Sequence, residues 1–231
     1  MIRLWYNTFY MSEKEIKDNI DAHIGEITNE FKDGFEFIRK YPKSVTIFGS
    51  SRLTTASSHY KDAKNLASKI VSDLNYAVIT GGGPGIMEAA NMGAKEAGGK
   101  SIGLNIKLPI EQHINPHATE SMAFQYFFSR KAMLTFAAEA YVFFPGGFGT
   151  FDELFGILTL LQTKKIPSVP VILFGKDFWN PVRDLIKANM LDKHHTIEDE
   201  DMKLFVITDS IDQTIKAIEG APISEWWKSF D

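Results

Sequence analysis

Hydrophobic residues recur at two different spacings along the chain, and the change between them divides it in two. Between residues 12 and 40 the spacing is three to four, which predicts one long helix. Ser12 and Glu15 stand three residues apart at its start, as in a capping box. We expect an arm of residues 1–40 that packs on the rest of the chain or on a partner subunit. The apolar positions of its helix are Ile16, Ile20, Ile24, Ile27, Phe31 and Phe35.

From residue 41 to residue 231, short apolar runs alternate with stretches of helical spacing. Runs that are apolar throughout are typical of strands buried on both faces, and their alternation with helices predicts a parallel sheet. The fold class is therefore α/β, a single doubly wound, Rossmann-like domain preceded by the helical arm. The expected strands are 44–49, 76–80, 100–106, 140–144, 169–174 and 204–208. The expected helices are 57–73, 84–97, 123–138, 149–163, 180–190 and 210–219.

Glycines gather where two expected strands end. Residues 81–85 read Gly-Gly-Gly-Pro-Gly, with Pro84 suited to a first helical turn, and residues 145–150 read Pro-Gly-Gly-Phe-Gly-Thr. Glycine lets a backbone approach a ligand closely, and a helix N-terminus presents free N–H groups to an anion. The alternative is that these glycines only form tight turns. Ligands of such sheets lie beyond the carboxyl ends of the strands, so we expect a shared anion site there. Its expected residues are Gly82, Gly83, Gly85, Gly146, Gly147, Gly149 and Thr150.

Charged and hydroxyl side chains near these turns each have a structural and a functional interpretation. Ser50 and Arg52 follow the first strand and offer a hydroxyl and a guanidinium to a ligand. Glu153, three residues after Thr150, either completes a capping box or places a carboxylate at the cleft. Glu88 either complements its helix dipole or accepts hydrogen bonds from ribose hydroxyls.

Arg130 and Lys131 belong to the expected helix 123–138. Such a pair commonly forms a solvated face. The residues before it are mostly aromatic, however, so this helix start is expected to be partly buried. A partly buried arginine needs an anionic partner.

Composition removes several classes of function. The 231 residues include no cysteine, which excludes disulfides, thiolate catalysis and cysteine-based metal sites. The histidines have no metal-binding spacing, and we expect neither a metal nor a cofactor. A net charge of −4 argues against a dedicated nucleic-acid binder. The dinucleotide fingerprint and the P-loop pattern are missing, which argues against an oxidoreductase and an ATPase.

No long apolar run or signal-peptide core stands in the sequence, so we expect no membrane partner and a cytoplasmic location. Residues 150–163 are apolar nearly all round. Such a helix is either buried on several sides within the chain or a contact between subunits. We expect a homodimer or a higher homo-oligomer.

Three motifs resemble the LONELY GUY (LOG) family. They are PGGFGTFDE at 145–153, GGGPGIMEAAN at 81–91 and SRKAML at 129–134, and they lie in the family's order. Members of that family were long labelled "possible lysine decarboxylase", and several are nucleoside 5'-monophosphate phosphoribohydrolases. A decarboxylase of that kind needs pyridoxal phosphate on a lysine in a much longer chain, and no such lysine context stands here.

The resemblance implies a role for each motif. Glu153 would be the catalytic carboxylate and Arg130 the second catalytic residue. Residues 146–150 would hold the 5'-phosphate of a nucleotide substrate such as AMP, aided by residues 82–85, with Glu88 near the sugar. The third motif adds Lys131 and Met133 to the expected substrate-binding residues. Gln125 stands where one bacterial branch often has histidine, which leaves the base preference open. The alternative is a non-catalytic nucleotide or cofactor carrier or sensor of the same fold.

Overall fold

A computed structural model describes residues 12–108 and 115–222 of the chain. The first residues of the expected arm and the last residues of the expected domain, 1–11 and 223–231, lie outside the described residues. Within that part, seven strands form one parallel sheet in the order β4-β3-β2-β1-β5-β6-β7. The predicted α/β doubly wound fold is confirmed. The strands are β1 (Ser44–Phe48), β2 (Ala77–Thr80), β3 (Ser101–Ile106), β4 (Glu120–Phe124), β5 (Ala140–Phe143), β6 (Val171–Phe174) and β7 (Val206–Thr208).

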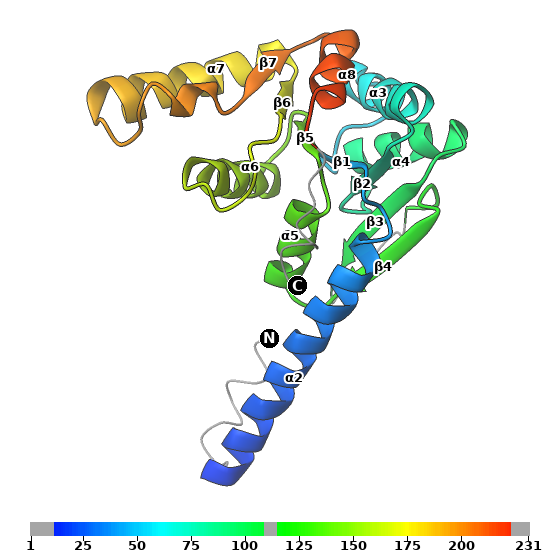
Figure 1. Cartoon of the computed structure of the whole chain (residues 1–231), viewed down its shortest axis with the longest axis vertical. Helices are drawn as coiled ribbons and strands as arrows, with labels where there is room; N and C mark the ends of the chain where they lie inside the picture. The colour runs from blue at the N-terminus through cyan, green and yellow to red at the C-terminus, as the bar shows by residue number, and fades with distance from the viewer. Residues whose placement is uncertain (1–11, 109–114, 223–231) are drawn as a thin grey trace.

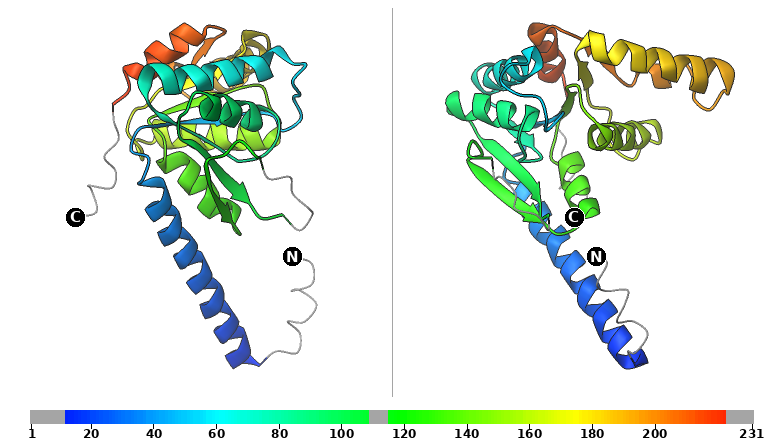
Figure 2. Two further views of the ribbon diagram at one scale, coloured as in Figure 1. Left: turned by 90° about the vertical axis from the view of Figure 1, so that its right-hand side faces the viewer. Right: turned by 180° about the vertical axis from the view of Figure 1, so that it is seen from behind.

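Helices cover both faces of the sheet, which makes three layers (Figure 1, Figure 2). On one face α3, α4 and α8 bury apolar side chains against residues such as Val45 and Val142. On the other face α5, α6 and α7 pack against residues such as Ile79 and Phe143. Burial on both sides explains why most strands are apolar throughout. The helices are α2 (Glu13–Ile38), α3 (Ser58–Leu74), α4 (Ile86–Glu96), α5 (Phe127–Phe136), α6 (Phe148–Gln162), α7 (Lys176–Ile186) and α8 (Ile211–Glu219).

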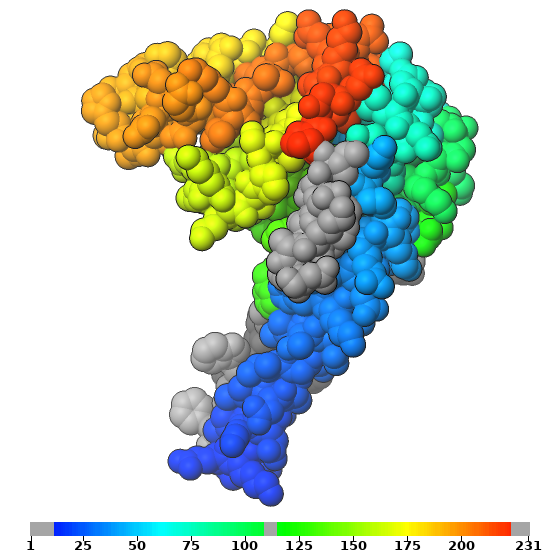
Figure 3. All heavy atoms as spheres, in the orientation of Figure 1, coloured from blue at the N-terminus to red at the C-terminus, as the bar shows by residue number. Residues whose placement is uncertain are grey.

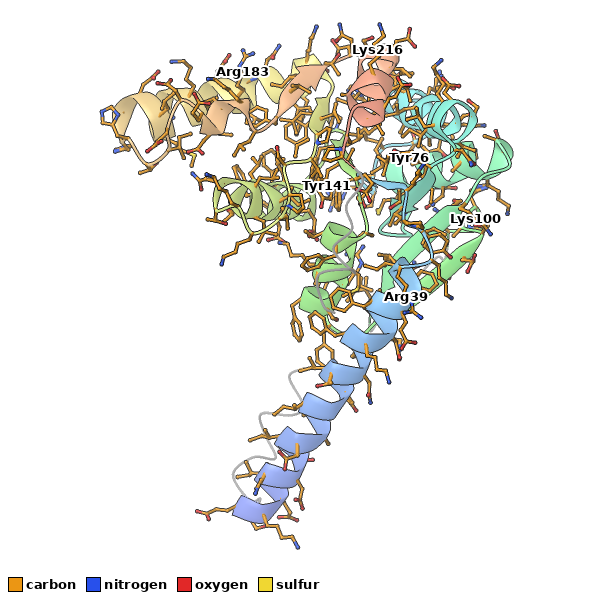
Figure 4. The ribbon with its side chains drawn as sticks, in the orientation of Figure 1. Arg39, Tyr76, Lys100, Tyr141, Arg183 and Lys216 are labelled. Atoms are coloured by element: carbon orange, nitrogen blue, oxygen red, sulfur yellow. The ribbon has the colours of Figure 1, made fainter. Side chains whose placement is uncertain are left out.

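The predicted long helix at the start of the chain is α2, and it stands out from the body of the molecule (Figure 3). Ser12 and Glu15 form the predicted capping box: the Ser12 N–H donates to the Glu15 carboxylate at 2.8 Å. Arg39, labelled in Figure 4, follows the end of α2 where the helix meets the sheet. Among the described residues, α2 packs on the body mainly through its second half, against α5 and β4, while Ile20 and Ile24 are exposed.

Three element boundaries differ from the prediction. The expected helix 123–138 is shorter, because residues 120–124 form the edge strand β4, whose exposed alternate positions lack the apolar run of an inner strand. Helix α4 begins at Ile86, so Pro84 lies in the turn before it and not in its first turn. Helix α7 begins at Lys176, contains Pro181, and continues as a π-helical segment, Lys187–Lys193.

Candidate active site

A cavity of about 940 Å³ opens where β1, β2 and β5 end, at the carboxyl edge of the sheet. This is where the strand order changes direction, because the chain runs outward from β1 to one side and from β5 to the other. Its walls also include the starts of α5 and α6. The lining residues are Phe48, Gly49, Ser50, Ser51, Arg52, Gly81, Met87, Phe127, Arg130, Leu134, Gly146, Gly147, Phe148, Gly149, Thr150, Phe151, Asp152 and Glu153.

The turn between β5 and α6 forms one wall of the cavity. Gly147 is the N-cap of α6, and its carbonyl accepts the N–H groups of Thr150 and Phe151 at 3.0 and 3.1 Å. The N–H groups before these have no carbonyl partner inside the helix, so they can bind an anion. A Cβ at Gly146 would lie 2.1 Å from the Thr150 hydroxyl, so this turn requires glycine there, whereas a Cβ at Gly147 or at Gly149 would meet nothing within 4 Å.

Glu153 lies in the second turn of α6 and is buried in the cavity wall, with 9% of its surface exposed. The capping-box alternative is wrong, because α6 has no side-chain cap and its N-cap is Gly147. The Oε2 atom of Glu153 is buried and has no hydrogen-bond partner among the described residues. Burial raises the pKa of Glu153, and the nearby charges of Lys131 and Arg130 partly oppose that rise.

Arg130 reaches the cavity from the first turn of α5. Its Nε donates to the Leu104 carbonyl at 2.6 Å and its Nη2 to the Gly81 carbonyl at 3.2 Å. These two bonds fix the guanidinium plane between β3 and the end of β2. Burial lowers the pKa of Arg130 and the charge of Glu153 opposes that shift, but an arginine keeps its charge in either case. The predicted pair of Glu153 and Arg130 therefore lies in one cavity.

Lys131 lies outside the cavity wall and binds Asp152 near the start of α6. Its Nζ bonds the Asp152 carboxylate at 2.7 Å and the Asp152 carbonyl at 3.0 Å. Lys131 is not part of the cavity wall, but its positive charge is the largest influence that favours the ionised form of Glu153.

The other glycine turn, between β2 and α4, meets the cavity through Gly81 and Met87 only. Gly82 has φ of +68° and its carbonyl accepts a hydrogen bond from Asn105 at 3.0 Å. Gly85 has φ of +72°, and a Cβ there would lie 2.3 Å from the Ser50 carbonyl. These glycines, with the buried Gly83, shape the turn and lie outside the cavity wall.

Two more expected substrate-binding residues lie outside the wall. Glu88 points toward His117, whose Nε2 is 4.0 Å from its carboxylate. Met133 is fully buried, and it occupies the space that a Cβ of Gly34 in α2 would fill. Ser50 and Arg52, by contrast, are in the wall as predicted. The binding role of each of these residues stays a prediction.

Sequence reasoning missed the aromatic rim of the cavity. Phe148 is 98% exposed and Phe127 is 64% exposed, and both border the opening. The sequence contained one sign of this rim: Phe148 stands between glycines in the turn after β5, where a large apolar side chain has little of its own turn to pack against. Within residues 12–108 and 115–222, no group of three or more acidic or histidine side chains could hold a metal ion. No helix in the same residues is long and apolar enough to cross a membrane.

The family described as "Possible lysine decarboxylase" matches residues 87–218, which include Arg130 and Glu153. The chain belongs to this family, the LOG family. One LOG relative is "Probable cytokinin riboside 5'-monophosphate phosphoribohydrolase LOG6" of Arabidopsis thaliana, 32% identical over 138 residues, which are 58% of this chain and 67% of the relative. Another is LOG5 of the same plant, 27% identical, with 62% of each chain covered. A third is the cytokinin riboside 5'-monophosphate phosphoribohydrolase of Rhodococcoides fascians, 25% identical over 64% of this chain and 76% of the relative.

Solved structures support the fold of this LOG family member. The molybdenum cofactor carrier protein of Chlamydomonas reinhardtii has a TM-score of 0.58 at 21% identity, over 77% of this chain and 96% of that one. The molybdenum cofactor binding protein of Rippkaea orientalis has a TM-score of 0.57 at 22% identity, over 76% and 93%. Both likenesses concern the fold alone.

Proposed function

We propose that the protein hydrolyses the N-glycosidic bond of nucleoside 5'-monophosphates and releases the free base and ribose 5-phosphate. One observation carries the proposal: the buried Glu153 carboxylate, whose Oε2 has no hydrogen-bond partner in the described part of the chain, lies in the same cavity wall as the fixed Arg130 guanidinium and the open N-terminus of α6. A carboxylate is costly to bury without a partner, and such sites are where perturbed acids do chemistry.

The start of α6 is the proposed phosphate subsite. Its free N–H groups and the positive end of the helix dipole favour an anion at the turn of residues 146–150. Ser50, whose N–H donates to the Pro145 carbonyl at 3.0 Å, and Arg52 lie in the same cavity wall and add a hydroxyl and a positive charge. The phosphate anchors the substrate, so binding energy far from the reacting bond positions that bond.

Glu153 follows this turn by one helical turn, which suits a group that acts on the sugar next to the phosphate. Breaking the bond between C1' and the base builds positive charge on the ribose ring. The Glu153 carboxylate stabilises that charge and accepts a proton from the attacking water, which adds its oxygen to C1'. The departing base takes up one proton, so protons balance over the reaction. Arg130 orients the substrate and Glu153.

The names of the LOG relatives agree with this chemistry, since the relatives from Arabidopsis thaliana and Rhodococcoides fascians are both named phosphoribohydrolases. We extend that activity to this chain without choosing the base, because Gln125 and the aromatic rim leave the base preference open. The expected homo-oligomer also stays a prediction. Helix α6 leaves the apolar side chains of Phe148 and Phe155 exposed, where a second copy of the chain could contact them. Light scattering of the purified protein tests this expected association.

The decisive experiment is a panel of nucleoside 5'-monophosphates incubated with the protein, with chromatography of the products. Free base and ribose 5-phosphate in equal amounts are expected. Glu153→Gln keeps the size of the side chain but removes the carboxylate that accepts the proton from water. This substitution is expected to lower kcat by about 10²- to 10⁴-fold. Glu219→Gln, on the exposed end of α8, is the matched control and keeps full activity.

Two results would overturn this assignment in different ways. Full activity of Glu153→Gln would show that the carboxylate has another role. Calorimetric binding of nucleotides without turnover by the unchanged protein would instead favour the carrier or sensor.

A further inference from the structure

The N-terminus of α5 is capped by a side chain from a distant part of the sequence. Tyr126, the N-cap of α5, makes no side-chain cap, so the first N–H groups of the helix need partners from elsewhere. Glu30 of α2 provides a partner for the N–H group of the N-cap residue and for the N–H group just before it. Its carboxylate accepts the N–H groups of Gln125 and Tyr126, the latter at 3.2 Å, and the hydroxyl of Ser129. A carboxylate at this position also stabilises the positive end of the α5 dipole.

Neighbouring contacts hold α2 in register with α5. The Tyr126 hydroxyl donates to Glu26 at 3.2 Å and lies 3.3 Å from Nδ1 of His23. The rings of Phe31 and Phe128 stack with centroids 6.4 Å apart. Gly34 lets the two helices approach so closely that a Cβ there would lie 2.8 Å from the Met133 side chain.

The capped turn is the one that carries Arg130. Ser129, which bonds Glu30, is followed directly by Arg130, whose guanidinium then bonds the carbonyls of Leu104 and Gly81. A shift of α5 would therefore move the guanidinium within the cavity. Reaction rates are sensitive to such shifts, since a misplacement of about 1 Å in a catalytic group can lower the rate about 100-fold.

We infer that Glu30 is a positioning residue for Arg130, through which the arm helix α2 sets the geometry of the candidate active site. Glu30 is not among the residues that line the cavity, and it acts by fixing the first turn of α5. The effect on catalysis rests on the proposed function, whereas the effect on the Arg130 guanidinium does not.

Glu30→Ala removes all three hydrogen bonds, and Glu30→Gln keeps one acceptor oxygen for a milder second variant. The matched control is Glu36→Ala, six residues further along the same exposed helix, whose side chain lies away from α5 in the shallow pocket beside Arg39 and Met122. Activity against the best nucleotide of the panel is measured as kcat and KM separately, per folded molecule. Exchange of the Arg130 Nε–H with solvent is followed by NMR.

Glu30→Ala is expected to lower kcat about tenfold with little change in KM, because the phosphate turn lies on α6 and not on α5. It also exposes the Arg130 Nε–H to faster exchange, while Glu36→Ala behaves as the unchanged protein. Glu30→Gln is expected to fall between the two. Should Glu30→Ala fail to fold, Glu30→Gln provides the same two measurements.

The inference fails if Glu30→Ala lowers only the melting temperature and leaves both kcat and the Nε–H exchange as in Glu36→Ala. If the unchanged protein hydrolyses no nucleotide, the proposed function fails while the exchange of the Nε–H still decides the role of Glu30.

Discussion

The two glycine turns look alike in the sequence and differ in the structure. Other groups of the protein already bond the turn after β2. The Asn105 side chain donates to the Gly82 carbonyl, and the first N–H of α4, at Ile86, donates to the Ser50 carbonyl at 3.0 Å. The turn after β5 is open, because a Cβ added at Gly147 or Gly149 would meet nothing within 4 Å. Gly82 and Gly85 of the first turn satisfy packing and backbone conformation. In the second turn Gly146 is also required by packing, whereas Gly147 and Gly149 leave room.

The comparison teaches that glycine content alone does not locate a ligand. Available N–H groups are the better guide to an anion site, and the neighbouring groups decide whether those N–H groups are available. In this protein the neighbours close the turn after β2 and leave the turn after β5 free. Four substitutions test that difference.

The largest expected effect belongs to Gly85→Ala. Gly85 has φ of +72°, and the new Cβ would lie 2.3 Å from the Ser50 carbonyl, a backbone atom that cannot move aside alone. The variant should lose about 3 kcal/mol of unfolding free energy or fail to fold. Chemical denaturation checks this. Unchanged stability would show that the turn after β2 is as open as its counterpart.

Asn105→Ala should have the next largest effect. It removes the hydrogen bond to the Gly82 carbonyl and leaves that buried group without its partner, at a cost of about 1–3 kcal/mol. Nucleotide affinity, measured by calorimetry, should stay within about twofold, since a lost buried hydrogen bond acts on the fold. A large fall in affinity at unchanged stability would contradict the idea that this turn is structural.

Glu153→Gln should make the fold more stable at neutral pH while it removes activity. Burial raises the pKa of Glu153 above its ordinary value of 4.5, so folding favours the protonated form. That contribution is complete below pH 4.5 and is lost as the pH rises through the higher pKa of the folded protein. Above that pKa the variant should therefore have a larger unfolding free energy than the unchanged protein. Denaturation followed from about pH 4 to about pH 8 measures the difference in unfolding free energy. A gap that does not widen as the pH rises would contradict the direction of the shift.

Gly149→Ala should have the smallest effect on stability and the opposite sign from Gly85→Ala. Gly149 lies in the first turn of α6 with open space around it, so alanine should stabilise the helix by about 0.5 kcal/mol. Affinity for ribose 5-phosphate should fall, because the new methyl group narrows the approach to the free N–H groups. Unchanged affinity would place the phosphate away from this turn.

Most of the sheet could be predicted because its inner strands are apolar on both sides. The edge strand β4 could not, since its residues alternate between partly buried and exposed and precede a helix without a turn signal. In the site, the family motifs pointed to Glu153 and Arg130, which the structure brings into one cavity. Met133 belongs to the same motif as Arg130 and lies three residues later on the same helix, but its side chain is buried against Gly34 of α2. The motif alone does not contain this packing. The contact of Glu30 with α5 depends on how α2 docks, and no local pattern contains that information.

The strand order also governs when the cavity comes into existence. Pairs β1–β2 and β2–β3 join segments that are near in sequence. The pair β1–β5, by contrast, joins segments that are far apart in sequence, with Val45 beside Ala140. Closing so long a loop is slow compared with forming the local units. A chain emerging from the ribosome can therefore assemble the half with α3 and α4 well before Glu153 has been synthesised. The cavity would then be completed in a late step, when the second half adds its first strand beside β1.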